Sequence, residues 1–150
     1  MENIDNAERL ELALLPLADG RRVAIPLTLL AEVRQIKISS KDQTDLGCFK
    51  WRGHDLLIHS LEEMCGLPAP SPEEHMTVGV LRASRDASQP FRAIAFCGLA
   101  SHRMLDADQM QDVELPAEGT FRGAAEVDGE TYLVPDLSVL TYDSGSQLLH

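Results

Sequence analysis

The chain has 150 residues, with 13 lysines and arginines against 24 aspartates and glutamates, which gives a formal net charge of −11 at pH 7. This acidic balance argues against nucleic acid and anionic lipid as partners, because both select basic patches. Hydrophobic residues make up 44% of the chain, enough for one packed domain or two small ones. Since no apolar run reaches the ~18 residues that cross a bilayer, and residues 1–5 lack the basic region of a secretory signal, we expect a soluble, cytoplasmic protein without membrane insertion.

The three cysteines, Cys48, Cys65 and Cys97, are odd in number and unevenly spaced. This pattern fits neither a disulfide framework nor a zinc knuckle. We therefore expect free thiols in a reducing compartment.

Short apolar segments separated by turn residues predict a series of β-strands. In the first half of the chain the predicted strands are residues 11–17, 22–25, 31–38, 48–51 and 56–58. Pro26 ends the second strand because proline cannot donate to a strand ladder, and residues 27–30 follow as a helical turn. Residues 39–45 are polar without periodicity and predict a loop, whereas Gly53-His54 predicts the turn of a hairpin.

A short helix is predicted to begin after Ser60. Ser60 and Glu63 have the spacing of a capping box, in which each side chain accepts a hydrogen bond from the other residue's backbone N–H. Gly66 supplies a left-handed stop, and the prolines that follow it prevent continuation. Residues 68–75 are therefore the predicted linker.

In the second half of the chain the predicted strands are residues 78–81, 91–96, 121–127 and 131–134. Asp128-Gly129, between the last two, is the strongest hairpin signal in the sequence. Asp136 is placed to cap a last helix that reaches about residue 140.

A weak internal repeat relates three of these units. Residues 20–26 match residues 129–135, with Asp before the Gly and Pro at the end of each, and residues 53–61 match residues 129–137. Two similar β-units with only short helices predict an all-β protein of two small barrels.

Three motifs resemble those of the CheW-like domain family, the adaptor module of bacterial chemosensory arrays. Residues 24–26 (AIP) and 30–33 (LAEV) resemble the family's Ile-Pro strand end and the Val-x-Glu element that follows it. Residues 47–53 (GCFKWRG) resemble its glycine before an Arg-Gly hairpin, and residues 123–137 resemble its closing strands and last helix. The resemblance covers most of the chain.

The resemblance implies an all-β fold with short helices, in which two small SH3-like five-stranded β-barrels pack together over residues 8–143. The first barrel is expected over residues 20–75. The second is expected over residues 76–140, joined by the N-terminal strand at 11–17. Residues 144–150 are expected to form a frayed tail.

The resemblance also implies a function. Such a protein is a non-enzymatic adaptor that binds the regulatory domain of a CheA-like histidine autokinase and the cytoplasmic tip of methyl-accepting chemoreceptors. Two departures from the family pattern leave a second role open, because His59-Ser60 stands where Val-Asp is usual and Cys97 stands where Asp is usual. That role is an accessory protein of a type IV pilus chemosensory system, with altered or lost kinase coupling.

Four residues are candidate partner contacts. Leu30, Glu32 and Arg52 are candidates by their place in the family motifs, and Trp51, the lone tryptophan, because it stands beside Arg52. Arg52 suits a contact because a guanidinium pairs bidentately with a carboxylate; the alternative is that it braces its own hairpin. Leu30 is a contact or a core residue, and Glu32 a contact or a solvated acid. Trp51 is an exposed hot spot beside Arg52 or part of a barrel core.

A function of another class remains open, a small β-barrel enzyme or ligand-binding protein that uses Cys97 and His102. Cys97 lacks the tight turn around a nucleophile, and an unreactive buried cysteine is commoner. His54 and His59 lie five apart, so on one strand they would face opposite sides, which disfavours a shared metal ion. We expect no catalytic residue, metal or cofactor.

Two pairs of acids, Glu62 with Glu63 and Asp106 with Asp108, fall in polar segments. We expect all four to be solvated, without acid–base chemistry. No glycine-rich phosphate loop joins a strand to a helix, so nucleotide binding is not expected.

Overall fold

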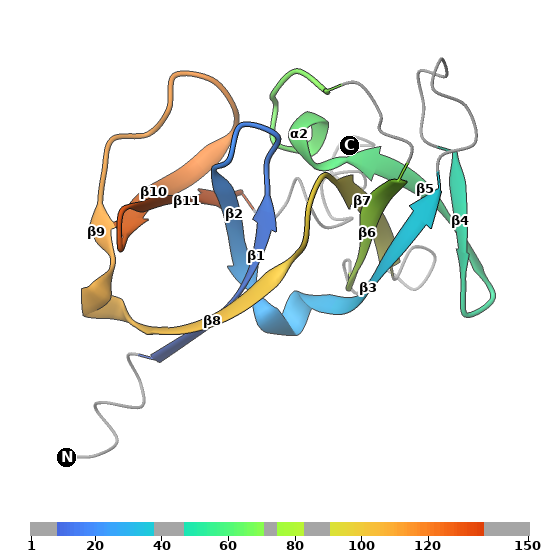
Figure 1. The fold of residues 1–150 in the computed structure, drawn as a ribbon, viewed down its shortest axis with the longest axis horizontal. Coiled ribbons are helices and arrows are strands. Elements are labelled where there is room, and N and C mark those ends of the chain that lie inside the picture. The colour runs from blue at the N-terminus through green and yellow to red at the C-terminus, as the bar shows by residue number, and fades with distance from the viewer. Residues whose placement is uncertain (1–8, 38–46, 71–74, 83–90, 137–150) are drawn as a thin grey trace, which may run out of the picture.

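The computed structural model describes residues 9–37, 47–70, 75–82 and 91–136, and these residues form two curled sheets (Figure 1). One sheet has six strands in the order β8-β1-β2-β11-β10-β9, and the other has five in the order β3-β6-β7-β5-β4. The six-stranded sheet contains β1 (Arg9–Pro16), β2 (Arg22–Pro26), β8 (Ser101–Asp106), β9 (Gln111–Asp112), β10 (Phe121–Val127) and β11 (Glu130–Pro135). The five-stranded sheet contains β3 (Leu30–Lys37), β4 (Cys48–Trp51), β5 (His54–Ser60), β6 (His75–Arg82) and β7 (Phe91–Phe96).

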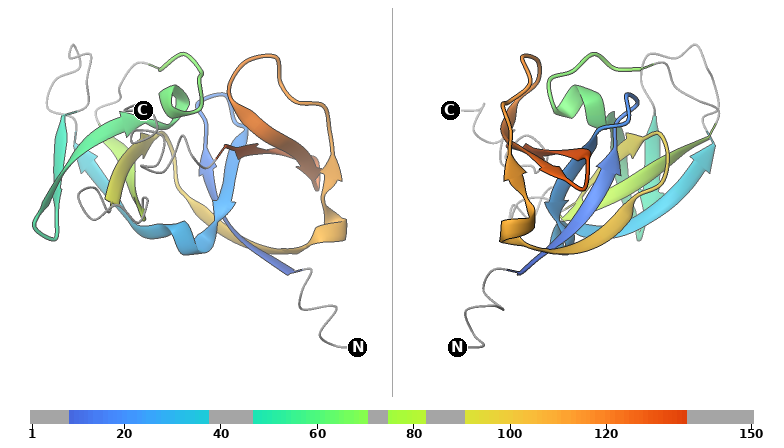
Figure 2. Two further views of the ribbon diagram at one scale, coloured as in Figure 1. Left: turned by 180° about the vertical axis from the view of Figure 1, so that it is seen from behind. Right: turned by 60° about the vertical axis from the view of Figure 1, so that its left-hand side comes forward.

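Within the described residues, helix is confined to short pieces at the strand ends. These are η1 (Leu27–Leu29), α2 (Leu61–Met64) and η2 (Ala107–Gln109). Figure 2 shows the two sheets side by side, with α2 near their junction. No helix in the described ranges is long and apolar enough to cross a membrane.

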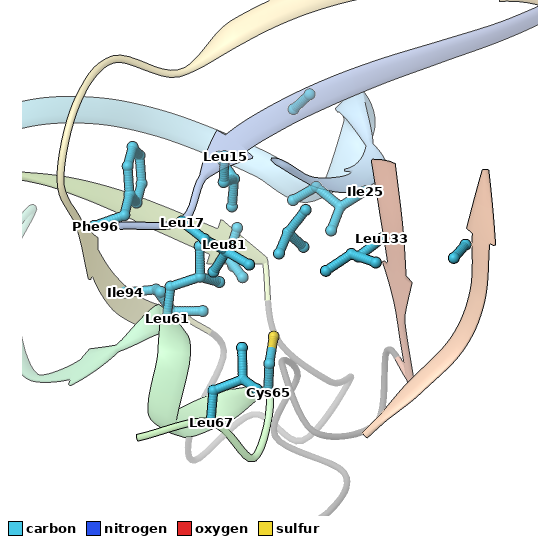
Figure 3. Packing of buried hydrophobic residues seen from close by; sticks show 13 residues of the cluster. Leu15, Leu17, Ile25, Leu61, Cys65, Leu67, Leu81, Ile94, Phe96 and Leu133 are labelled. Carbon is cyan, nitrogen blue, oxygen red and sulfur yellow. The ribbon is translucent and has the colours of Figure 1, made fainter. Parts of the chain in front are cut away.

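The two sheets share one hydrophobic core, which we call the seam core. Figure 3 shows side chains of both sheets meeting there, with α2 and the segment after it closing one side. The buried members are Ala13, Leu15, Leu17, Val23, Ile25, Leu61, Cys65, Leu67, Leu81, Ile94, Phe96, Ala124 and Leu133. Since each fully buried Leu, Ile or Phe side chain contributes roughly 1.5–3 kcal/mol, this shared core holds the sheets together.

Each sheet also curls around a smaller core of its own, and so forms a half-barrel. The core of the five-stranded half-barrel is Trp51, Leu56, Ile58, Met76, Val78, Val80, Ala93 and Ala95. The core of the six-stranded half-barrel is Leu14, Ala24, Leu105, Val127 and Tyr132.

The central strands are buried on both faces because they lie between two of these cores. On β7, Ile94 and Phe96 face the seam core, whereas Ala93 and Ala95 face the five-stranded half-barrel. A strand buried on both faces is apolar without alternation. This explains the continuous apolar run Ala93-Ile94-Ala95-Phe96.

The all-β class, with two curled sheets and few helices, confirms the fold predicted from the sequence. The hairpin at Asp128-Gly129 joins β10 to β11 as predicted. Ser60 is the N-cap of α2, and its Oγ accepts from the backbone N–H of Glu63, which is half of the predicted capping box.

The predicted division of the chain into barrels needs correction. β6 and β7, expected in the second barrel, pair with β3 and β5 of the five-stranded sheet. β2, expected in the first, lies between β1 and β11 in the six-stranded sheet. The parallel pairs β5–β7 and β2–β11 join segments far apart in the sequence, and no local pattern encodes such pairing.

Two local predictions also need correction. The turn between β4 and β5 is Arg52-Gly53, one residue earlier than predicted. β8 was not predicted, because its sequence is mostly polar and only Leu105 is buried. The predicted loop 39–45, the middle of the linker at 71–74, the last helix to residue 140 and the tail 144–150 lie outside the described residues.

Candidate partner-binding site

The turn between β4 and β5 holds two consecutive residues at positive φ, Arg52 at +49° and Gly53 at +82°. Trp51 and His54 are the last cross-strand pair before this two-residue turn. Positive φ at both central positions defines a type I′ hairpin, which favours Asn, Asp or Gly. Arginine is an uncommon choice there.

Trp51 lies beneath the turn, inside the five-stranded half-barrel. It is 3% exposed, and its ring meets Phe91 edge-on with centroids 4.7 Å apart. Of the two alternatives for Trp51, the structure therefore has the core residue and not the exposed hot spot. The indole N–H still has a polar partner, as a buried indole generally requires, because Nε1 donates to Glu32 Oε1 at 3.0 Å.

This hydrogen bond joins the two edges of the five-stranded sheet, since Glu32 lies on β3 and Trp51 on β4. The pairing of β3 with β6 shifts register between Leu30 and Glu32. Such a bulge turns side chains away from strict alternation. Glu32 therefore reaches the end of the half-barrel, whereas Leu30 is half-buried and packs on the seam core.

Glu32 gathers three donors or cations around one carboxylate. Besides Trp51, Arg34 Nη2 donates to Oε2, and Arg52 Nη2 lies 3.9 Å from Oε1. The hydrogen bond from Trp51, followed by that from Arg34, lowers the pKa of Glu32 below its ordinary value. Glu32 is therefore ionised at neutral pH.

Arg52 is the exposed member of this group. Its side chain is 72% exposed, and its guanidinium carbon lies 4.7 Å from the centre of the Trp51 ring. Within the described ranges, Glu32 is the one acidic group within 4 Å of that guanidinium. The ring and the carboxylate limit where the cation lies, while most of its donors face solvent.

The structure thus brings three of the four candidates together, and we call Glu32, Trp51 and Arg52 the Arg52 cluster. Leu30 is not part of it. The sequence reading missed Arg34 and Phe91, which support Glu32 and Trp51. A two-residue spacing of opposite charges, Glu32 and Arg34 on one strand face, was the available signal for Arg34.

The residues weighed for other chemistry lie in separate surroundings. His102 is about half exposed on β8, with Nε2 3.7 Å from Glu11 Oε2, and Cys97 packs against the core of the five-stranded half-barrel. Burial and the nearby charge of Glu62 raise the pKa of Cys65 to about 12, which makes its thiol unreactive. In the part of the chain that the structure describes, no three His, Cys, Asp or Glu side chains lie close enough together to hold a metal ion.

Glu62 is the clear error among the solvated acids. It is 5% exposed, whereas Glu63, Asp106 and Asp108 are exposed as expected. The short α2 turns Glu62 toward the β1–β2 turn, where Oε2 accepts from the backbone N–H of Ala18 at 2.9 Å.

Two half-barrels that share a core, each ending in a turn with an exposed charged residue, make this an all-β domain of two half-barrels. The model of the CheW-like domain matches residues 13–144, and the chain belongs to that family. The family is one of chemotaxis adaptor and scaffolding domains rather than enzymes.

Among solved structures, the chain is similar to the scaffolding protein TtCheW from Thermoanaerobacter tengcongensis. The two are 12% identical with a TM-score of 0.60, over 83% of this chain and 87% of that chain. At this identity the likeness concerns the fold alone. No curated protein matches the chain.

Proposed function

We propose that this protein is a non-enzymatic chemosensory adaptor that couples a CheA-like histidine autokinase to methyl-accepting chemoreceptors by protein–protein binding. Arg52 is one of its contacts. Family membership over residues 13–144 supports the adaptor role. The observation that carries the site is an exposed arginine at positive φ, over a buried tryptophan ring.

The backbone conformation at Arg52 lowers the stability of the fold, and the ion pair that this side chain makes recovers little of that loss. A non-glycine residue at positive φ costs roughly 1–2 kcal/mol, and its ion pair with Glu32 is long and exposed, a kind that contributes only about 0–1 kcal/mol. Strained backbone positions of this kind cluster at functional sites. The strain therefore supports a role for Arg52 outside the fold.

The partner group that suits Arg52 is a carboxylate. A guanidinium presents a planar fork of N–H donors that pairs bidentately with a carboxylate, and water exclusion in a complex strengthens that pair. Trp51 and Glu32 are positioning residues, because they touch Arg52 and keep it near the end of the half-barrel. An acidic side chain on the kinase regulatory domain or on the receptor tip is the expected counterpart.

The test is a calorimetric titration of the full chain with the regulatory domain of the CheA-like kinase, and separately with a receptor-tip fragment. Arg52→Ala is compared with Arg122→Ala, a matched control whose side chain is 71% exposed and 3.8 Å from Asp136. We expect Arg52→Ala to lose about tenfold or more in affinity for one partner, which is about 1.4 kcal/mol. Arg122→Ala should bind like the wild type.

Two results would count against the proposal. Equal affinities of Arg52→Ala and wild type for both partners would remove Arg52 from the contacts. A folded wild type that binds neither partner would overturn the coupling role itself and leave the accessory role in a pilus chemosensory system as the better account.

A further inference from the structure

A second site lies away from the Arg52 cluster, beside α2. A half-open cavity of about 190 Å³ is lined by the β1–β2 turn, by the segment after α2 and by Glu118. Figure 1 places the β1–β2 turn, α2 and the segment before β10 along one edge of the molecule. The backbone N–H of Thr120 donates to the carbonyl of Cys65 at 2.8 Å, so the segment that carries Glu118 is tied to the end of α2.

This cavity is lined by both apolar and acidic side chains. Leu17 and Leu67, both members of the seam core, line it together with Pro68 and Pro70. Its charged lining residues are the acids Asp19, Glu62 and Glu118 and the single cation Arg21.

The cation Arg21 is already committed to one of the acids. Its Nε and Nη2 donate to Asp19 Oδ2 at 2.9 and 2.7 Å. This pairing lowers the pKa of Asp19. Glu62 and Glu118 are therefore the acids that Arg21 does not neutralise.

Glu62 is a buried charge without a counterion. Both of its oxygens accept hydrogen bonds, Oε2 from the Ala18 N–H at 2.9 Å and Oε1 from Ser60 Oγ at 3.3 Å. Both donors are neutral, and no cation of the described residues lies within 4 Å of this carboxylate. A buried charge is normally paired, and a carboxylate can accept about four hydrogen bonds, so Glu62 has acceptor capacity left.

We propose that this cavity binds an arginine side chain of a partner protein. The aliphatic stem packs on Leu17, Leu67 and Pro68, and the guanidinium pairs with Glu62 and Glu118. The cavity is smaller than the roughly 300–1,000 Å³ of sites for drug-sized ligands, a size that suits one side chain. An arginine also matches the walls chemically, since it combines an apolar stem with a charged head.

The proposal goes beyond the coupling function, because it needs neither the kinase nor the receptor. It gives the adaptor a second, acidic contact for a basic segment, distinct from the basic contact at Arg52. A partner with one acidic and one basic side chain therefore binds in one orientation, with its acidic side chain on Arg52 and its basic side chain in the cavity.

The test is an NMR titration of the 15N-labelled full chain with N-acetyl-arginine amide, beside its neutral isostere N-acetyl-citrulline amide. We expect saturable shifts at the amides of Ala18, Leu67 and Glu118 with the arginine probe only. Glu62→Gln and Glu118→Gln should each weaken this binding, Glu62→Gln by about tenfold or more. Glu114→Gln, an exposed acid outside the cavity, should bind like the wild type.

Several outcomes overturn the proposal. They are equal binding of the two probes, shifts spread over the acidic surface, equal weakening by Glu114→Gln, and no saturable shift. Selective binding of putrescine in place of the arginine probe would assign the cavity to a free diamine. If Glu62→Gln does not fold, the comparison of probes on wild type and Glu118→Gln decides.

Discussion

The two half-barrels end in the same kind of turn, but the charged residue is basic in one turn and acidic in the other. The β4–β5 turn of the five-stranded half-barrel is Arg52-Gly53, and the β10–β11 turn of the six-stranded half-barrel is Asp128-Gly129. All four residues have positive φ, so both are type I′ turns. In each half-barrel a charged residue on an edge strand reaches the turn, Glu32 on β3 and Arg103 on β8.

The difference lies in how well each turn residue suits its place. Asp128 is a residue type that accepts positive φ readily, and Arg103 binds it tightly while also donating to the hydroxyl of the buried Tyr132 at 3.1 Å. The charge of that turn is therefore paired within the fold. Arg52 is a poor residue for positive φ, and its ion pair with Glu32 is 3.9 Å long.

The two turns contrast a structural turn with a turn that we propose contacts a partner. In the six-stranded half-barrel the bracing cation is on the edge strand and the turn carries the acid that suits the backbone. In the five-stranded half-barrel, Trp51 and Glu32 form the brace through their own hydrogen bond, and Arg52 adds a 3.9 Å ion pair and its contact with the Trp51 ring. We propose that the remaining donors of Arg52 serve a partner.

The largest expected effect is on the brace of the five-stranded half-barrel. Trp51→Ala removes a buried ring and the hydrogen bond to Glu32, and we expect it to lower the free energy of unfolding by about 3–5 kcal/mol. Trp51→Phe should cost less, because it keeps a ring in the core. Urea denaturation measures both, and a loss below about 1 kcal/mol for Trp51→Ala would contradict the core position of this ring.

The next effect compares the two turns directly. Asp128→Ala places a poor residue at positive φ and removes the partner of Arg103, and we expect a loss of about 1 kcal/mol or more. Arg52→Ala exchanges one poor residue for another, so its loss in the same denaturation assay should be smaller. If Arg52→Ala destabilises the protein more than Asp128→Ala does, Arg52 is a brace and the contrast between the turns is wrong.

Glycine at the Arg52 position sharpens the same contrast. Since glycine adopts positive φ without a Cβ penalty, and a Cβ at neighbouring Gly53 meets nothing within 4 Å, the turn is open to solvent. We expect the free energy of unfolding of Arg52→Gly to exceed that of Arg52→Ala by about 1 kcal/mol. In urea denaturation this appears as a higher midpoint for Arg52→Gly. Equal stabilities of the two variants would mean that the backbone at Arg52 is not strained.

The smallest expected effect is the pH dependence of the Glu32 brace. Because the hydrogen bond from Trp51 and the pairing with Arg34 lower the folded-state pKa of Glu32, its charge stabilises the fold fully at neutral pH. That contribution is lost as the pH falls through the lowered pKa. The urea midpoints of wild type and Glu32→Gln should therefore differ at pH 7 and converge in acid, whereas a constant difference would contradict this role of the charge.

Local sequence chemistry was enough to predict the strands other than β8 and β9, and the end of β2 at Pro26. Positive-φ tolerance identified Asp128-Gly129, and the family motif placed Glu32 and Arg52 among the candidates. What it could not predict was nonlocal. The assignment of β2 and β7 to their sheets depends on the parallel pairs β2–β11 and β5–β7, and that of β6 on its antiparallel pairing with β3. These pairs join distant segments and leave no periodic signal in either strand.

Burial of polar or amphipathic side chains was the second limit. Glu62 lies in the first turn of a short helix, a position that is usually solvated, and here it is buried where the β1–β2 turn packs against that helix. Trp51 is buried because β3 and β4 meet across the end of the half-barrel. Both outcomes follow from how separate elements pack, which the residues alone did not reveal.

The most direct test of the central claim measures fold and binding together in Arg52→Gly. Our account predicts that this variant is at least as stable as Arg52→Ala, yet binds the kinase regulatory domain or the receptor tip about tenfold more weakly than the wild type. A variant that keeps full affinity for both partners would show that the arginine at this turn has no outward use.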